Sequence, residues 1–265
     1  MAEFVAMECI SRRLALAQLA AMALPLSAHA GDSARETGRL TARPRLGTPA
    51  EPSPPKGYSL LGPNKDDRTR DAVLYAPANF DALKPAPLLV FLHGAGENGA
   101  LMAKTLREVA EARGFLLLAP TSRGLTWDLH RAPACPDTAT VDAAMKAVFS
   151  ATTIDPRHIA LGGFSDGGSF AISLGLANGD LFSDVLAFSA GFFHAPMGFG
   201  RPRVFLSHGR RDRVIDFGMG RDISSRLRSA GYDVRFEPFD GDHDIPKAGL
   251  DIALNRFLGM SSSLP

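Results

Sequence analysis

The sequence predicts a mixed α/β domain, built on a mostly parallel sheet with helices packed on its faces. Strand-like and helix-like segments alternate from about residue 71 onward, an order typical of parallel strands joined by crossover helices. Several strand candidates, such as Leu88–Leu92, are continuous apolar runs, as expected for strands that are buried on both faces. Glycine-rich or polar turns follow these runs, where sites lie in such sheets.

Local patterns define the individual elements. Strands are predicted where short apolar runs stop at proline, glycine or polar residues. Helices are predicted where apolar residues recur every three or four positions, as they do between residues 137 and 150. The predicted strands are 71–75, 88–92, 115–119, 159–162, 185–189, 204–207 and 234–238. The predicted helices are 101–113, 137–150, 167–176, 217–229 and 247–258.

Composition excludes several functional classes. The 265 residues are 45% hydrophobic and 22% charged, with a net charge of +1, so the chain is globular and lacks the basic excess of a nucleic-acid binder. No uncharged apolar stretch long enough for a transmembrane helix occurs in the body of the chain. Two cysteines, Cys9 and Cys135, cannot build a disulfide framework. The histidines form no metal-binding motif, so neither a metal nor a cofactor is expected.

The N-terminal 30 residues are predicted to be a signal peptide. Arg12 and Arg13 precede the apolar stretch 14–26, and the small-x-small pattern Ala28-His29-Ala30 follows. A buried amphipathic helix is the alternative. The paired arginines also resemble a twin-arginine signal, so we expect export to the periplasm or the cell exterior, by that route or the general one.

Two regions follow the predicted signal peptide. Residues 31–56 are polar and then rich in proline, so we expect a mobile linker that packs no core. Residues 57–265 have a globular composition, and their length suits one folded domain.

The segment Gly163-Phe164-Ser165-Asp166-Gly167 has the pattern G-x-S-x-G, between a predicted strand and a predicted helix. A sharp strand-to-helix turn needs glycines, because the neighbouring backbones approach closely, and it lifts the serine hydroxyl clear of the sheet. A structural serine or a phosphate-binding loop is the alternative, but no nucleotide-binding motif occurs. Ser165 is therefore a candidate nucleophile.

Two later turns supply candidates for a base and an acid. Asp212 follows the strand 204–207, and His243 follows the strand 234–238. His243 would remove the proton from the serine hydroxyl, and Asp212 would orient its imidazole, with Asp216 as the alternative acid. Taken singly, each could equally be a polar residue in a surface turn.

The turn after strand 88–92 is a candidate oxyanion hole. Its sequence, HGAGENG, contains glycines that let backbone N–H groups approach a substrate oxygen. We predict that the main-chain N–H groups of Ala95 and Asp166 bind the oxyanion; a plain turn is the alternative. His93 is expected to be a structural hydrogen-bonding residue. Phe192 and Phe193 either line an apolar acyl pocket, with Met197 and Phe199, or pack in the core.

The segments FLHGAGENG, IDPRHIALGGFSDGG, SHGRRDRVI and GDHDIP together resemble the phospholipase/carboxylesterase branch of the α/β-hydrolase fold, which includes acyl-protein thioesterases and bacterial carboxylesterases. The resemblance spans about residues 88–246. It implies an α/β-hydrolase fold with Ser165, Asp212 and His243 as catalytic triad. Trp127-Asp128 resembles the family's Trp-x-Asp stretch near the acyl site, so Trp127 is a candidate substrate-binding residue. The segment between strands 185–189 and 204–207 is too short for a large cap domain.

The resemblance implies a serine carboxylesterase, which needs no cofactor and acts on a small-molecule or polymeric ester, and the predicted signal peptide implies that it is secreted. A peptidase or amidase, a lipase, a thioesterase and a polyester hydrolase are alternatives, because the same triad serves acyl transfer generally. A non-catalytic binding module is a further alternative, although it would be expected to lack a triad member. The sequence predicts no oligomeric state.

Overall fold

The structure is a computed structural model, which describes residues 38–45, 47, 52–62, 71–128, 136–195 and 198–260. The predicted signal peptide, parts of the predicted linker, Cys135 and Met197 lie outside the described residues. Within those ranges, no helix has both the length and the apolar character needed to cross a membrane.

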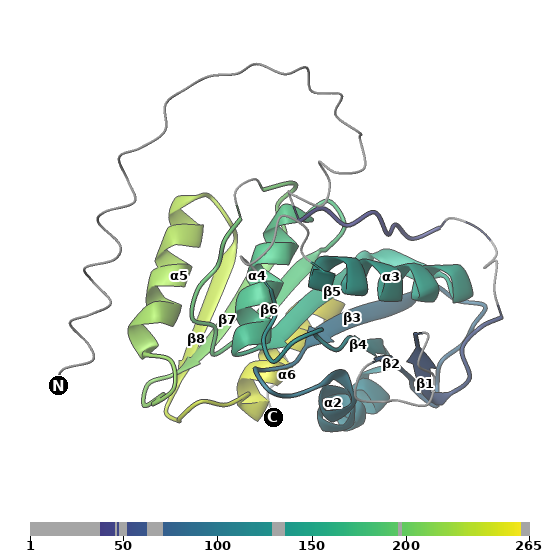
Figure 1. The fold of residues 1–265 in the computed structure, drawn as a ribbon, viewed down its shortest axis with the longest axis horizontal. Coiled ribbons are helices and arrows are strands. Elements are labelled where there is room, and N and C mark those ends of the chain that lie inside the picture. Colours follow the sequence, from purple (N-terminus) through teal and green to yellow (C-terminus); the bar gives the residue numbers. More distant parts are fainter. Residues whose placement is uncertain are drawn as a thin grey trace, which may run out of the picture. The chain divides into compact units, whose positions relative to one another are not determined.

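One sheet of eight strands forms the centre of the described chain, in the order β1-β2-β4-β3-β5-β6-β7-β8 (Figure 1). The pairs β1–β2 and β2–β4 are antiparallel, and every other neighbouring pair is parallel. The strands are β1 (Gly57–Leu61), β2 (Ala72–Ala76), β3 (Ala86–Leu92), β4 (Leu116–Ala119), β5 (Ile154–Phe164), β6 (Asp184–Phe188), β7 (Arg203–Gly209) and β8 (Val234–Phe239).

Helices cover both faces of this sheet. Figure 1 shows α3, α4 and α5 on one face and α2 and α6 on the other. Strand β3 shows the alternation that makes this possible: Leu88 and Val90 pack with α3 and α4, whereas Leu89 and Phe91 pack with α2 and α6. The helices are α2 (Gly99–Arg113), α3 (Pro136–Ala151), α4 (Asp166–Ala177), α5 (Phe217–Ser229) and α6 (Lys247–Leu258).

The architecture agrees with the predicted fold class. Each predicted strand and helix is present; α5 and α6 have the predicted ends, and the other elements have shifted ends. The described residues contain no large cap domain. Strand β1 was not predicted. It lies at the edge of the sheet and pairs only with β2. Its five residues are half-buried or exposed, so it lacks the apolar run that marks the central strands.

Residues 38–45 differ from the prediction of a linker that packs no core. Leu40 and Ala42 are buried in the core cluster shared with α3 and α4. The Arg39 guanidinium donates to both carboxylate oxygens of Asp180, at 2.6 and 2.8 Å. The prediction rested on the polar and proline-rich composition of the whole segment, so it missed two apolar side chains that pack in the core.

Candidate active site

Ser165 lies at the tip of the turn between β5 and α4. Its backbone has φ 55° and ψ −117°, a conformation that non-glycine residues seldom adopt and that is held only by surrounding structure. Here its N–H donates to the carbonyl of Phe188, at 2.8 Å. Ser165 occupies the N-cap position of α4, yet its hydroxyl makes no capping hydrogen bond. The hydroxyl is thus not committed to the helix, as a nucleophile requires.

The glycines of the G-x-S-x-G pattern have steric roles. A Cβ on Gly163 would lie 2.2 Å from the carbonyl oxygen of Gly167. A Cβ on Gly167 would lie 2.4 Å from the carbonyl oxygen of His93. Either methyl group would collide with backbone, so only glycine lets the start of α4 approach the end of β3.

Asp212 and His243 come together at the carboxyl ends of β7 and β8. Their side chains are joined by a hydrogen bond of 2.7 Å between His243 Nδ1 and Asp212 Oδ2. The Asp212 side chain is 0% exposed and that of His243 is 14% exposed. The His243 ring lies against Phe164, the residue before Ser165, with ring centroids 4.8 Å apart. The imidazole is therefore fixed on one side by a buried carboxyl group and on the other by the nucleophile turn.

Hydrogen bonds keep Asp212 ionised although it is buried. Burial alone would raise its pKa, but the N–H groups of Ile215 and Val214 both donate to Oδ1, at 2.8 and 2.9 Å. Together with His243, they hold the pKa of Asp212 below its ordinary value. Asp216, the alternative acid, instead caps α5 by accepting the N–H of Gly218 at 2.8 Å. The structure therefore pairs His243 with Asp212.

The turns that carry Asp212 and His243 are also fastened to each other. The Arg213 N–H and Nε–H donate to the two carboxylate oxygens of Asp242, at 3.0 and 2.7 Å. Asp242 Oδ1 also accepts the N–H of His243, at 2.9 Å. Gly209 lies so close to this turn that a Cβ would be 2.2 Å from the carbonyl oxygen of Asp242. These contacts fix the base relative to its acid.

The turn after β3 presents Ala95 at the surface. The N–H of Gly94 donates to Glu97 Oε2 at 2.9 Å, and the N–H of Gly96 donates to the carbonyl of Leu125 at 2.7 Å. Among the described residues, the N–H of Ala95 between them meets no protein acceptor. Asp166 is the first residue of α4, where N–H groups point out of the end of the helix. Both positions suit the predicted oxyanion hole.

His93 is a buried structural residue, as its predicted hydrogen-bonding role requires. Its Nε2 accepts the N–H of Ser122 at 2.9 Å, and its Nδ1 lies 2.7 Å from the carbonyl oxygen of Gly94. The proton therefore resides on Nδ1, and burial lowers the pKa of the ring below its ordinary value. This imidazole has no nitrogen left to act as a base.

Trp127 lies beneath the candidate oxyanion turn and does not line an open pocket. The side chain is 3% exposed, and its Nε1–H donates to the carbonyl of His93 at 2.8 Å. Its backbone N–H donates to the Asp166 carboxylate, at 2.7 Å. Its ring stacks on Phe170, with centroids 5.2 Å apart. Trp127 is thus buried and does not face a substrate, contrary to the prediction. It connects His93, at the start of the candidate oxyanion turn, to the side chain of Asp166.

The two candidate pocket phenylalanines have different environments. Phe192 is 43% exposed, whereas Phe193 packs against the core cluster beneath α4 and α5 and lies under the guanidinium of Arg226. Ser169 Oγ accepts the N–H of Gly191, at 3.0 Å, and so ties this segment to α4. Phe192 is thus the more exposed of the two.

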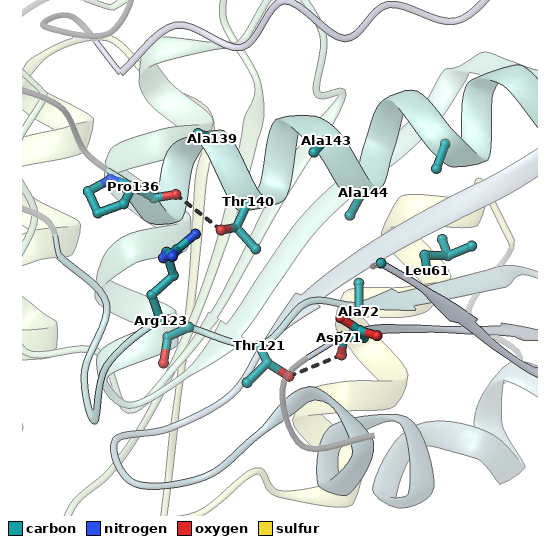
Figure 2. A pocket seen from close by; sticks show the side chains of 13 residues that line it. Leu61, Asp71, Ala72, Thr121, Arg123, Pro136, Ala139, Thr140, Ala143 and Ala144 are labelled. Atoms are coloured by element: carbon teal, nitrogen blue, oxygen red, sulfur yellow. Dashed lines mark hydrogen bonds between the residues drawn. The ribbon is translucent and has the colours of Figure 1, made fainter. Parts of the chain in front are cut away.

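A cavity of about 670 Å³ lies between α3 and the ends of β1 and β2 (Figure 2). Alanines of α3 form one wall, and Asp71 and Thr121 lie opposite (Figure 2). None of the triad candidates is among the described residues that line it. The Asp71 Oδ2 atom is itself buried without a hydrogen-bond partner. The cavity is distinct from the candidate active site.

A pair of carboxyl groups anchors the loop that leads to Trp127. The Asp137 side chain, at the start of α3, accepts the N–H groups of Arg123 and Asp128 at 2.7 and 2.9 Å. Burial, opposed by these hydrogen bonds and assisted by the charge of Asp128, raises the pKa of Asp137 to about 6. Neither this pair nor Glu97 was predicted, because no sequence motif marks a carboxyl group that accepts backbone N–H groups.

Comparisons with known proteins find that the chain is similar to esterases. Residues 137–261 match the family model described as phospholipase/carboxylesterase. Over 166 residues, 60% of each chain, the sequence is 28% identical to a probable feruloyl esterase C of Aspergillus flavus. The chain thus spans about three fifths of the length of that relative.

Solved structures show the same fold. An acetyl xylan esterase from Aspergillus awamori has a TM-score of 0.59 and 14% identity, and the alignment covers 77% of this chain and 99% of that one. A phospholipase/carboxylesterase from Dyadobacter fermentans has a TM-score of 0.57 and 19% identity, with coverage of 72% and 97%. The described residues contain no group of three or more side chains suited to a metal ion.

Proposed function

We propose that this chain is a serine carboxylesterase of the α/β-hydrolase fold, which hydrolyses carboxylic esters through an acyl-enzyme; the match of residues 137–261 to the phospholipase/carboxylesterase family model supports this. The observation that carries the proposal is the hydrogen bond of 2.7 Å between the buried Asp212 carboxylate and His243 Nδ1. The His243 ring also packs against Phe164, the residue before Ser165, whose strained backbone leaves its hydroxyl uncommitted to the helix.

The first chemical step follows from the tautomer of His243. Because Nδ1 donates its proton to Asp212, Nε2 carries a lone pair and is free to act as a base. Nε2 takes the proton of the Ser165 hydroxyl as Oγ attacks the ester carbonyl carbon. The carboxylate of Asp212 stabilises the imidazolium that forms. His243 then returns the proton to the departing alkoxide, and the acyl group stays on Ser165.

The tetrahedral intermediate carries a negative oxygen, which the N–H groups of Ala95 and Asp166 would bind. Preorganised donors at such a position typically contribute about 3–4 kcal/mol each to transition-state stabilisation. Trp127 supports the two segments that carry these donors, since its indole donates to the carbonyl of His93 and its backbone N–H donates to the carboxylate of Asp166. In the second half-reaction, His243 activates water, which releases the acid and regenerates Ser165.

The proposal is tested by hydrolysis of p-nitrophenyl esters from C2 to C16, with the wild type beside Ser165→Ala. Ser225→Ala is a matched control, because Ser225 is exposed on α5. We expect Ser165→Ala to lose at least about a thousandfold in kcat with unchanged folding, and Ser225→Ala to match the wild type. Full activity of Ser165→Ala would refute the proposal, and activity on the matched anilides alone would favour an amidase.

The names of the relatives guide the choice of natural substrates. One relative is a probable feruloyl esterase and a fold neighbour is an acetyl xylan esterase. We therefore propose methyl ferulate and acetylated xylan as the first substrates beyond the p-nitrophenyl series. The alcohol side of the site is free of a large cap among the described residues, which suits esters attached to a polymer. Release of ferulate or acetate supports this assignment, and hydrolysis of small synthetic esters alone argues against it.

We further propose that the protein is exported after cleavage behind Ala30, on the strength of the basic, apolar and small-x-small pattern at its N-terminus. Expression with the native N-terminus in a bacterium should yield a mature protein that begins at Gly31. Replacing Arg12 and Arg13 together by lysine should block processing if the twin-arginine route is used. An uncleaved protein in the cytoplasm would contradict export.

A further inference from the structure

A second buried imidazole lies behind the candidate triad. We propose that His208 is a positioning residue: its Nε2–H donates to the carbonyl of Ile215 beside the back of Asp212, and so fixes the turn whose N–H groups hold the carboxylate for His243. Its effect on rate rests on the proposed esterase function; its proton position does not.

The geometry singles out one nitrogen of His208. The residue lies near the end of β7, and its side chain is 1% exposed. Its Nε2 lies 3.0 Å from the carbonyl oxygen of Ile215 and 3.3 Å from Asp212 Oδ2. The same Oδ2 accepts Nδ1 of His243, at 2.7 Å. The two imidazoles therefore share one carboxylate oxygen.

The proton position on His208 follows from its neighbours. Both atoms near Nε2 are oxygens without a proton to give, because a backbone carbonyl only accepts and Asp212 is held ionised. Nε2 must then carry the proton, which it donates to the carbonyl of Ile215; the longer contact of 3.3 Å with Asp212 Oδ2 sets this N–H beside the carboxylate. The other ring nitrogen, Nδ1, is buried without a hydrogen-bond partner, so a second proton placed there would be left unsatisfied. His208 is thus the neutral Nε2–H tautomer.

Asp212 accepts three N–H groups in a buried setting. Val214 and Ile215 fix Oδ1, His243 donates to Oδ2, and Nε2 of His208 lies 3.3 Å from the same Oδ2. Without His208, the Asp212 carboxylate could rotate around its fixed Oδ1 atom, and Oδ2 would no longer point steadily at His243. The lost N–H would also leave more negative charge for His243, which favours its imidazolium form.

The backbone is shaped to hold His208 in this position. Gly220, in the first turns of α5, passes so near that a Cβ there would lie 2.5 Å from His208 Nδ1. The Phe217 ring meets the imidazole edge-on, with centroids 6.1 Å apart. A histidine that merely filled space would need neither the tautomer nor the alignment with Asp212, and these two features separate positioning from packing.

The first experiment tests the tautomer in the wild-type protein, without reference to activity. Nitrogen-15 NMR of histidine-labelled protein should show His208 with a protonated Nε2 and an unprotonated Nδ1, and this pattern should persist in Ser165→Ala. A proton on Nδ1 would overturn the proposal, whether or not the protein is an esterase.

The second experiment compares two variants of His208. Gln places an N–H donor near the former Nε2, whereas Leu has a similar size and no donor. We expect His208→Leu to lower kcat about tenfold with KM within twofold, because the hydrogen bond that fixes Ile215 and the N–H beside the Asp212 carboxylate are both lost. The acid limb of kcat/KM should move up by about half a pH unit. His208→Gln should retain most of the activity.

The outcomes distinguish the positioning role of His208 from the proposed esterase function. If folded His208→Leu keeps the wild-type kcat and acid limb, positioning by His208 is wrong while the esterase assignment stands. If His208→Leu does not fold, His208→Gln and the tautomer measurement decide. If the wild type hydrolyses no ester, the proposed function fails, and the NMR result still decides the hydrogen bond.

Discussion

Replacing Asp212 by Asn changes one oxygen to an amide nitrogen and leaves the shape of the side chain intact. The oxygen of the amide is held in place, because Oδ1 accepts the N–H groups of Val214 and Ile215 at 2.9 and 2.8 Å. The new NH2 group must therefore occupy the Oδ2 position, 2.7 Å from His243 Nδ1. A donor there forces Nδ1 to become the acceptor, so the proton of the imidazole moves to Nε2.

The expected loss is large, because an imidazole with its proton on Nε2 cannot remove the proton of the Ser165 hydroxyl. In other Ser-His-Asp enzymes, this substitution lowers kcat about 10⁴-fold, which corresponds to about 5 kcal/mol of transition-state stabilisation. The amide of Asp212→Asn also presents its second N–H toward His208 Nε2, 3.3 Å from the replaced oxygen. We therefore also expect the free energy of unfolding of Asp212→Asn to fall by about 1–3 kcal/mol.

The assay is steady-state hydrolysis of p-nitrophenyl acetate, with Asp216→Asn as the matched control. Asp216 caps α5 through its side chain, and asparagine caps a helix about as well, so the control should keep wild-type kinetics. If Asp212→Asn kept more than a tenth of the wild-type kcat while folded, the assignment of Asp212 as the orienting acid would be wrong.

Three further predictions concern the scaffold. Gly167→Ala should destabilise the protein by about 3 kcal/mol or more and lower ester hydrolysis, since its Cβ would lie 2.4 Å from the His93 carbonyl oxygen; Gly124→Ala, whose nearest contact is 3.6 Å, should be neutral by thermal melting. Leu40→Ala should cost about 2–4 kcal/mol in chemical denaturation, because Leu40 is buried, whereas a free linker would show no change. Since folding raises the pKa of Asp137 to about 6, the fold favours its protonated form. The stability that Asp137 contributes is therefore complete below about pH 4 and is lost as the pH rises through 6. The stability of the wild type relative to Asp137→Asn should thus fall by about 2 kcal/mol between pH 4 and 7, and a constant difference would show that Asp137 does not titrate as described.

The sequence was informative where the chemistry is local. The turn around Ser165 needs glycines at fixed offsets, and the buried strands need continuous apolar runs, so both features leave patterns that a single sequence shows. The order of Ser165, Asp212 and His243 along the chain, each after a strand, placed all three at one edge of a parallel sheet. The hydrogen bond between Asp212 and His243 agrees with that placement.

The features that were missed depend on contacts between distant residues. The Leu40 N–H donates to Asn178 Oδ1, which is 138 positions away, and no window of sequence relates the two. Trp127 matched a family stretch near the acyl site, but its indole turns inward because His93 offers it a buried carbonyl. His208 lies only four positions before Asp212, yet the strand end and turn between them decide whether the two side chains meet.

The most direct test of the account is the site of covalent labelling by a fluorophosphonate, located by peptide mass spectrometry. We predict one equivalent of label on Ser165. Asp212→Asn should slow the labelling about as strongly as it slows hydrolysis, and a folded Ser165→Ala should take up no label. Label on another residue, or no label on a wild-type protein that hydrolyses esters, would contradict the assignment of Ser165 as the nucleophile.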